Sequence, residues 1–468
     1  MKNYYIFHLL IVFSILFISC ENYLDIKPKG YVVPSTVVDY ERILNDFSLT
    51  KLLSDGIEKL SDDYYNPALE EGLQIQDADY RLYFWLNDPY TNASDLQYYS
   101  PWNILYNAIY QYNAVINGID KASGGSQDRK DIAKGRALVG RPICYYYLNN
   151  IYGQIPSSTT DKVALGVPLV ISNKLTDALP SRSSTWLIFD FIVKDLKDGI
   201  QLLPTTSSTN YQINKLGAYG WLARTYLSMK EYSKAEEAAN EVLKINAKLI
   251  DYNTQCERVE SNTEEVAYQL KSSSTMKSPA LHPENLHVIY FGYTRGMAFQ
   301  NIANSLVELF DVYDLRRINI IPNEVPAGGK MNYMFMGLQS YEYSAGPTNA
   351  EMYLIKAESL ARNKKITEAL QTLNILRKTR IDQLHYQELS QLSEVATMHA
   401  ILNERRRELL FKGVRWFDMR RLQNDSQYGF TAQHELGNGQ FIKLEPNSPR
   451  YTMTIPTTAI TQQIVQNP

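Results

Sequence analysis

An internal repeat of small and large apolar residues constrains the fold of this chain more than any other feature. Ala223 is followed by Ala235, and Ala357 by Ala369, with the same separation in both copies. Large apolar residues recur around these alanines at helical spacing. Small residues let two antiparallel helices approach closely, and large residues fill the gaps between neighbouring pairs. The repeat therefore predicts stacked helix pairs.

This spacing is the pattern of tetratricopeptide repeats. Less regular helix pairs around 101–153 and 184–202 would be degenerate copies, so we expect a mainly α scaffold of about four helix pairs. Within the first of these, Arg141-Pro142 predicts a kink or a local break. Residues 251–347 lose the helical period and gain Gly, Pro and Tyr, which predicts a large, loop-rich insert with one helix at 302–313.

The stretch 403–422 reads N-E-R-R-R-E-L-L-F-K-G-V-R-W-F-D-M-R-R-L. Arg405 lies on the same helical face as Met398, Leu402 and Leu409. A guanidinium on such a face needs carboxylates or carbonyls as acceptors. Dense mixtures of Arg and Glu usually lock elements together, although a ligand site is the alternative. We expect a structural clasp that includes Arg405, Glu408, Arg415, Trp416 and Asp418.

Two polar-aromatic stretches of the loop-rich segment 55–100 suit ligand binding, and the insert adds a third. A carbohydrate site needs an aromatic face for the sugar ring and nearby polar groups for its hydroxyls. Trp85, with Arg81, Asn87 and Tyr90 beside it, could supply both. Packing is the alternative for each side chain. The candidate ligand-binding residues are Asp62, Asp63, Tyr64, Arg81, Trp85, Asn87, Tyr90, Tyr290, Tyr293 and Arg295.

The chain begins with an apolar run that decides its compartment. Residues 4–18 are mostly apolar, too few for a comfortable membrane span, and Ser19-Cys20 follows. A small residue before cysteine at this place resembles the lipobox of bacterial lipoproteins, although Phe17 replaces the usual leucine. We expect a signal peptide at 1–19 and a lipidated Cys20. The alternative is an uncleaved anchor.

Composition excludes several classes of protein. A net charge of −3, from 47 basic and 50 acidic residues, argues against nucleic-acid binding. Cys144 and Cys256 could pair, but their spacing supports no disulfide framework or metal site. His282 and His287 flank Glu284, and ordinary histidines are the better interpretation there. We found no recognisable catalytic motif, and the sequence predicts no cofactor, no metal and no enzyme activity.

The two ends of the chain independently resemble the SusD/RagB family, the surface nutrient-binding lipoproteins of Bacteroidetes. The C-terminal run from Glu404 to Arg421 is similar to the family's E-R-R-R-E-L-x-F-x-G-x-R-W-x-D-x-x-R signature. The opening L-D-I-K-P-K-G, followed by P-S-T and a short helix predicted to continue through Phe47, resembles the family's mature start. Asp314-Leu-Arg-Arg317 is a further similar stretch.

The resemblance implies a surface-exposed, lipid-anchored protein of the cell outer membrane. It would bind an oligosaccharide and deliver it to a SusC-like TonB-dependent transporter. A RagB-like peptide cargo is the alternative, and a surface glycan hydrolase is a third. We expect residues 20–468 to form one intertwined unit with four parts: a tether and loop-rich segment at 20–100, a repeat scaffold at 101–250, a ligand-side insert at 251–347, and the last repeat pair and clasp at 348–468.

Overall fold

The structure is a computed structural model, and its fold is mainly α. It describes residues 34–54, 56–66, 77–90, 92, 95–96, 100–157, 161–174, 177–259, 267–274, 282–291, 300–323, 332–335, 344–436 and 439–467. Cys20 and the predicted signal peptide therefore lie outside the described residues. Among the described residues, no helix has the length and apolar character needed to cross a membrane.

Helices dominate the described part of the chain, with short strands between them. The helices and helical turns are α2 (Val37–Leu44), η2 (Phe47–Thr50), α3 (Gly56–Lys59), α4 (Ala78–Tyr83), α6 (Trp102–Gly118), η4 (Ile119–Lys121), α7 (Gln127–Tyr152), α8 (Thr185–Leu202), α9 (Lys215–Ser228), α10 (Tyr232–Ile245), α11 (Tyr252–Gln255), α12 (Asn304–Val307), η6 (Leu315–Asn319), α13 (Asn349–Arg362), α14 (Ile366–Lys378), α15 (Glu394–Glu408), α16 (Arg415–Leu422), η7 (Pro449–Tyr451) and η8 (Thr457–Ala459). The strands are β1 (Lys51–Leu53), β2 (Leu165–Pro168), β3 (Arg182–Ser184), β4 (Cys256–Val259), β5 (Ala267–Leu270), β6 (Tyr290–Phe291), β7 (Gln300–Ile302), β8 (Ile320–Asn323), β9 (Asn332–Phe335), β10 (Ala432–Glu435) and β11 (Phe441–Leu444).

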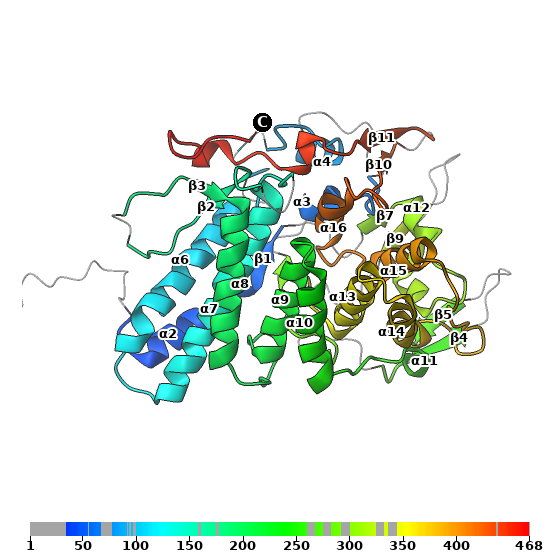
Figure 1. Cartoon of the computed structure of the whole chain (residues 1–468), viewed down its shortest axis with the longest axis horizontal. Helices are drawn as coiled ribbons and strands as arrows, with labels where there is room; N and C mark the ends of the chain where they lie inside the picture. The colour runs from blue at the N-terminus through cyan, green and yellow to red at the C-terminus, as the bar shows by residue number, and fades with distance from the viewer. Residues whose placement is uncertain are drawn as a thin grey trace, which may run out of the picture.

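The long helices stand side by side in chain order, as the repeat predicts. In Figure 1, α6, α7 and α8 form the left part of the row, α9 and α10 the middle, and α13, α14 and α15 the right. The α9–α10 and α13–α14 pairs carry the two alanine repeats, and α10 packs on α13. Ala223, Ala235, Ala357 and Ala369 are all fully buried, which lets the helices approach closely.

Helix α7 corrects the expectation of a local break at Arg141-Pro142, because it continues through Pro142. A proline inside a helix removes one backbone hydrogen bond and usually interrupts it. Here α7 lies between α6 and α8. The Arg141 guanidinium, next to the proline, donates to Asp195 at 2.8 Å and to Asn113 at 2.8 Å. Contacts to both neighbouring helices therefore hold this turn in helical form.

The insert is built from short antiparallel strands. β4 pairs with β5, and β7, β9 and β8 form a three-stranded sheet in that order. The single helix expected at 302–313 is wrong in extent. Ile302 ends strand β7, Ala303 is extended, and only the single turn α12 follows. Pairing of β7 with β9 takes the place of the first helical turn.

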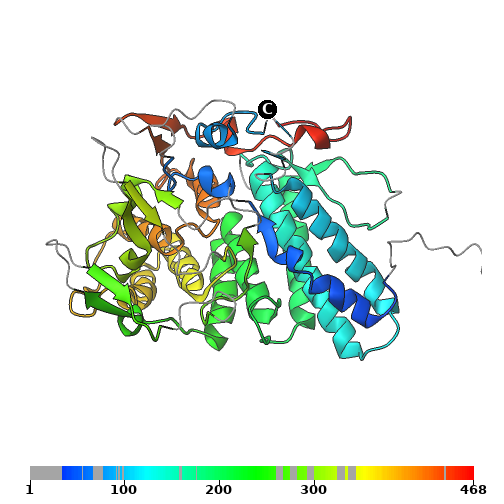
Figure 2. The same cartoon turned by 180° about the vertical axis from the view of Figure 1, so that it is seen from behind.

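The N-terminal segment crosses the face of the helix row that Figure 2 shows, passing from α2 through η2 to β1. The predicted helix through Phe47 ends earlier, at Leu44, and Asn45 is its C-cap. Asp46 then accepts a hydrogen bond from the Ser48 N–H at 2.8 Å and starts the separate turn η2. Strand β1 pairs in parallel with β6 of the insert, so distant parts of the chain meet here.

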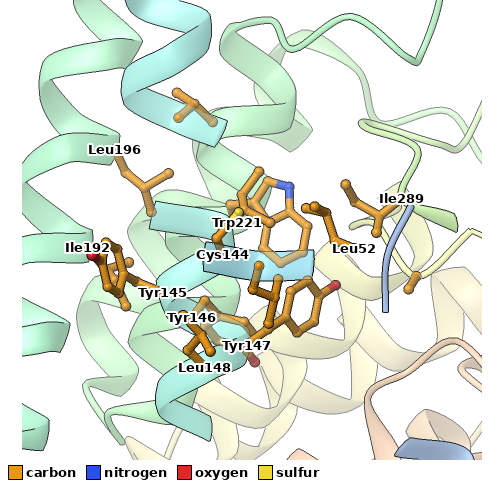
Figure 3. Packing of buried hydrophobic residues seen from close by; sticks show 14 of the residues in the cluster. Leu52, Cys144, Tyr145, Tyr146, Tyr147, Leu148, Ile192, Leu196, Trp221 and Ile289 are labelled. Atoms are coloured by element: carbon orange, nitrogen blue, oxygen red, sulfur yellow. The ribbon is translucent and has the colours of Figure 1, made fainter. Parts of the chain in front are cut away.

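The main core lies where α7, α8 and α9 meet β1 and β6. Tyr145, Tyr146 and Tyr147 follow one another on α7 and are all buried, and Tyr147 packs against Trp221 of α9 with ring centroids 5.6 Å apart (Figure 3). Many of the tyrosines are therefore core residues. Cys144 lies in the same cluster. It and Cys256 are both buried and unpaired, so they form no disulfide.

Candidate functional site

Asp62 and Asp63 lie in a buried ion-pair network with the C-terminal clasp. Arg415 donates to both carboxylate oxygens of Asp62, at 2.6 and 2.7 Å. Arg406 donates to Asp63. Burial would raise the pKa of Asp62, but the charges of Arg415 and Arg406 hold that pKa well below its ordinary value. Since both aspartates are buried and bonded to arginines, they hold elements together and are not open to a ligand in this structure.

The second part of the clasp joins α15, α16 and α13. Arg405 donates to Asp418 at 2.8 Å and lies 3.4 Å from Glu351 of α13. Burial opposes ionisation of Asp418, but the charge of Arg405 and then that of Arg421 lower its pKa to about 2. Asp418 is thus one of the acids expected to pair with Arg405.

Glu408 and Trp416 are also buried in this region. Glu408 accepts hydrogen bonds from Arg316 at 2.9 Å and from Arg380 at 2.8 Å. Arg380 in turn donates to Glu284, between the two histidines considered for a metal site. No metal-binding cluster is present among the described residues. Trp416 stacks near Tyr451 of the C-terminal segment, with ring centroids 5.8 Å apart.

The Trp85 side chain is packed inside the fold and does not present an exposed ring to a ligand. Only 3% of its surface is exposed, and its indole N–H donates to the Leu60 carbonyl at 3.0 Å. His434 is stacked between Trp85 and Tyr83, with ring centroids 4.1 and 4.0 Å away. Tyr64 is buried as well and packs edge-on against Tyr83. These side chains are occupied by packing, so no sugar ring can stack on Trp85 without local rearrangement.

The loop after Trp85 nevertheless forms one side of an open cleft of about 220 Å³. Asn87 and Asp88 are exposed there, and Tyr90 is half-buried. The opposite side comes from the C-terminal segment. We call this the Tyr90 cleft, and it is lined by Asn87, Asp88, Tyr90, Leu96, Thr454, Ile455, Pro456, Thr457 and Gln466.

Hydrogen bonds from Arg81, in the N-terminal loops, and from Arg450, in the C-terminal segment, fix the shape of this cleft. Arg81 donates to the Asp88 carbonyl, which fixes the conformation of the loop after Trp85. Arg450 donates to the Trp85 carbonyl at 2.6 Å and joins the loop to the C-terminal segment. Arg81 and Trp85 do not line the Tyr90 cleft. They line a smaller adjoining cavity and hold the loop that forms one side of the cleft.

The C-terminal side of the cleft is equally fixed. Gln466 and Ile455 exchange two hydrogen bonds, at 2.7 and 2.8 Å. The Arg182 guanidinium, buried below them, donates to the Val465 carbonyl at 3.0 Å and to the Asn467 side chain at 2.8 Å. The cleft thus offers an aromatic ring beside amide, carboxylate and hydroxyl groups on a preformed frame.

The candidates from the insert do not join this cleft. Tyr290 is buried on β6, and its hydroxyl lies 2.6 Å from that of Tyr211. Tyr293 and Arg295 lie outside the described residues. Of the ten candidates, Asn87 and Tyr90 line the Tyr90 cleft, and Arg81 and Trp85 support it.

Sequence reasoning missed the C-terminal lining of the cleft. Thr454, Pro456, Thr457 and Gln466 carry groups that suit hydrogen bonding or ring contact, yet they lie more than 300 residues from Tyr90 in the chain. Local sequence patterns do not say which loop a segment so distant in the chain will face.

Two family models match this chain. One, described as starch-binding associating with outer membrane, matches residues 22–227. The other, described as the SusD family, matches residues 340–468. Together the two matches include the N-terminal loops, most of the helix row and the clasp.

Individual proteins are similar over most of the chain. A SusD-like protein of Formosa agariphila is 23% identical over 394 residues, which is 71% of this chain and 74% of that protein. A SusD superfamily protein of Bacteroides thetaiotaomicron has a similar structure, with a TM-score of 0.72, 21% identity, and coverage of 92% of this chain and 100% of the other. A SusD-like carbohydrate binding protein of Bacteroides vulgatus has a TM-score of 0.66 and 17% identity. That match covers 91% of this chain and 96% of the other.

Proposed function

The chain belongs to the SusD family, and on that premise we propose that it is a surface-exposed outer-membrane lipoprotein that binds an oligosaccharide and delivers it to a SusC-like TonB-dependent transporter. The family description, starch-binding associating with outer membrane, supports both the cargo and the compartment. Cys20 would carry the lipid anchor.

The observation that carries the cargo assignment is the composition of the Tyr90 cleft. The Tyr90 ring can contact the apolar face of a sugar, while Asn87 and Asp88 are exposed beside it to bond the hydroxyls. Thr457 adds a hydroxyl from the opposite side, where Gln466 is held by its hydrogen bonds to Ile455. Because the walls are fixed by hydrogen bonds, little ordering free energy has to be spent on binding.

The proposed role is binding without catalysis. Asp62 and Asp63, the two adjacent carboxylates among the candidate residues, are both buried and held by arginines. Asp88 is the single carboxylate among the lining residues of the Tyr90 cleft. Glycoside hydrolysis ordinarily uses two carboxyl groups that flank the scissile bond.

A binding screen tests the proposed cargo. Protein that begins after Cys20 is titrated by calorimetry with neutral oligosaccharides and with peptides of similar size, and each mixture is then analysed for cleavage. We expect at least one oligosaccharide to bind and to be recovered intact. Binding of peptides alone would favour the RagB-like alternative, and time-dependent cleavage would favour a hydrolase.

A further inference from the structure

A second cleft of about 220 Å³ lies near the N-terminal segment and the helix row. None of its lining residues is shared with the Tyr90 cleft. It forms where η2 follows α2, which packs on α6 and α7 (Figure 2). We call it the Phe47 cleft, and it is lined by Leu44, Asn45, Asp46, Phe47, Leu49, Thr50, Tyr112, Arg136, Thr209, Tyr211, Gln212, Ile213 and His287.

One wall of the Phe47 cleft is aromatic and partly open. The early end of α2 and the Asp46 cap turn Phe47 outward, so that 45% of its surface is exposed. Its ring centroid lies 6.1 Å from that of Tyr211 and 5.9 Å from that of Tyr290. Phe47 is thus held by two neighbouring rings while it presents an apolar surface to the solvent.

The other wall holds a cation without a carboxylate. Arg136 of α7 donates to the Gln212 side-chain oxygen at 3.0 Å. Its Nε is buried and has no acceptor within the described part of the chain. Burial lowers the pKa of Arg136, and the charge of Glu41 offsets this loss of water only in part. A guanidinium that lines a cleft, is partly desolvated and forms no ion pair with a described residue is a favourable site for an anion.

The described charged groups near Arg136 form no ion pair with it, so its guanidinium remains able to bind an anion. Glu41, the acid whose charge acts on Arg136, is itself held by two hydrogen bonds from Arg129, at 2.9 and 2.6 Å. Asp46 lines the cleft but uses one oxygen to cap η2. The Lys51 ammonium lies 4.9 Å from the centre of the Phe47 ring and adds a positive charge at the rim.

We propose that the Phe47 cleft is a second binding site, which takes a sugar ring that carries a carboxylate. The carboxylate would meet the Arg136 guanidinium, the apolar face of the ring would lie against Phe47, and Asn45 and Thr209 would bond the hydroxyls. The choice of a sugar as the ring rests on the proposed function, whereas the choice of an anion rests on Arg136 alone.

Uronic acids test this site directly. Binding of glucuronate and galacturonate is measured by saturation-transfer NMR and calorimetry, with glucose and galactose as neutral counterparts. We expect the uronates to bind and the neutral sugars to bind at least about tenfold more weakly at this site. Raised salt should weaken the uronates selectively, because their attraction to Arg136 and Lys51 is electrostatic.

Two variants locate the site. Arg136→Gln should weaken uronate binding at least about tenfold with only a small change in the thermal midpoint, because the substitution leaves no hydrogen-bonded carboxylate unpaired and the new amide can still donate to Gln212. Arg42→Gln is the matched control. It removes a charge from the neighbouring helix α2, where the side chain is 77% exposed and does not line the cleft. Equal uronate affinity in the wild type and in Arg136→Gln would overturn the proposal, as would the absence of uronate binding.

The outcome separates this site from the proposed function. If Tyr90→Ala abolishes uronate binding while Arg136→Gln retains it, the acidic sugar occupies the Tyr90 cleft and the second site is refuted. If neutral oligosaccharides bind but uronates do not, the proposed function stands and the second site falls. If uronates bind through Arg136 while no oligosaccharide binds through Tyr90, the second site stands without the first.

Discussion

Arg415 and Asp62 form a bidentate ion pair, at 2.6 and 2.7 Å, although 353 residues separate them in the chain. Through this pair the C-terminal clasp holds the N-terminal loops. Further along the chain, the same N-terminal part includes Arg81, Trp85 and then Tyr90, which lines the Tyr90 cleft. The pair therefore connects a stability element to the proposed binding surface.

The first prediction concerns this ion pair. Asp62→Asn should lower the free energy of unfolding by roughly 2–4 kcal/mol, because it leaves the buried Arg415 without its counter-charge. Urea denaturation followed by circular dichroism measures the change. Asp88→Asn is the control, since Asp88 is exposed and should change stability by less than about 0.5 kcal/mol. Unchanged stability of Asp62→Asn, together with lost oligosaccharide binding, would return Asp62 to the ligand site.

The second prediction concerns Glu58, which is buried beside the clasp and accepts a hydrogen bond from the Gly413 N–H. Burial raises the pKa of this carboxyl to about 8, from an ordinary value of 4.5. The folded chain therefore keeps a proton that the unfolded chain releases. Glu58 thus lowers the stability of the fold progressively as pH rises from about 4.5 to about 8.

Glu58→Gln removes this titration while it keeps an oxygen for the Gly413 N–H. We expect the variant to be more stable than the wild type by roughly 1–3 kcal/mol at pH 9 and to differ little at pH 5. Denaturant midpoints at the two pH values measure the difference. A gap that does not change with pH would contradict a proton on Glu58 in the folded state.

The third prediction concerns Trp85. Trp85→Ala should destabilise the fold by about 3–5 kcal/mol, because it empties a buried site, removes the donor to the Leu60 carbonyl and uncovers one face of the His434 ring. Trp85→Phe keeps the stack but removes the indole N–H, and should cost less. If Trp85→Ala instead retains full stability and loses only ligand affinity, the ring must be accessible to the ligand.

The fourth prediction concerns the anchor. Cys20→Ala should leave the protein unlipidated and released from the membrane fraction, because the proposed acyl chains have no other attachment. Acyl labelling and fractionation measure this. Cys144→Ala is the control, because that thiol is buried in the core. A Cys20→Ala variant that is still acylated and retained would refute the proposed anchor.

Local patterns predicted the parts of the fold that local interactions determine. The alanine spacings predict the helix pairs α9–α10 and α13–α14 that the structure shows. The predicted end of α2 was wrong because the apolar periodicity of the sequence continues to Phe47. The cap formed by Asp46 competes with that periodicity, and its geometry depends on only a few atoms.

The candidate site was less predictable because its contacts are long-range. Trp85 looks like a ligand platform in sequence, since the residues that cover it, His434 and Arg450, lie about 350 residues later. Asp62 was ambiguous for the same reason, because its arginine partner follows in the clasp. Composition singled out Tyr90 and Asn87, which line the Tyr90 cleft, as candidates, but the residues that face them in the C-terminal segment had no local signal.

The fifth prediction tests the central claim, that the Tyr90 cleft binds the cargo. An oligosaccharide found in the binding screen is titrated by calorimetry into the wild type, Tyr90→Ala and Tyr110→Ala. Tyr110 is the control, because it is a tyrosine of α6 that is 38% exposed and does not line the cleft. Tyr90→Ala should weaken binding by about 1–3 kcal/mol with stability nearly unchanged, and Tyr110→Ala should bind like the wild type. Equal affinity in all three proteins would contradict the assignment of the cargo to this cleft.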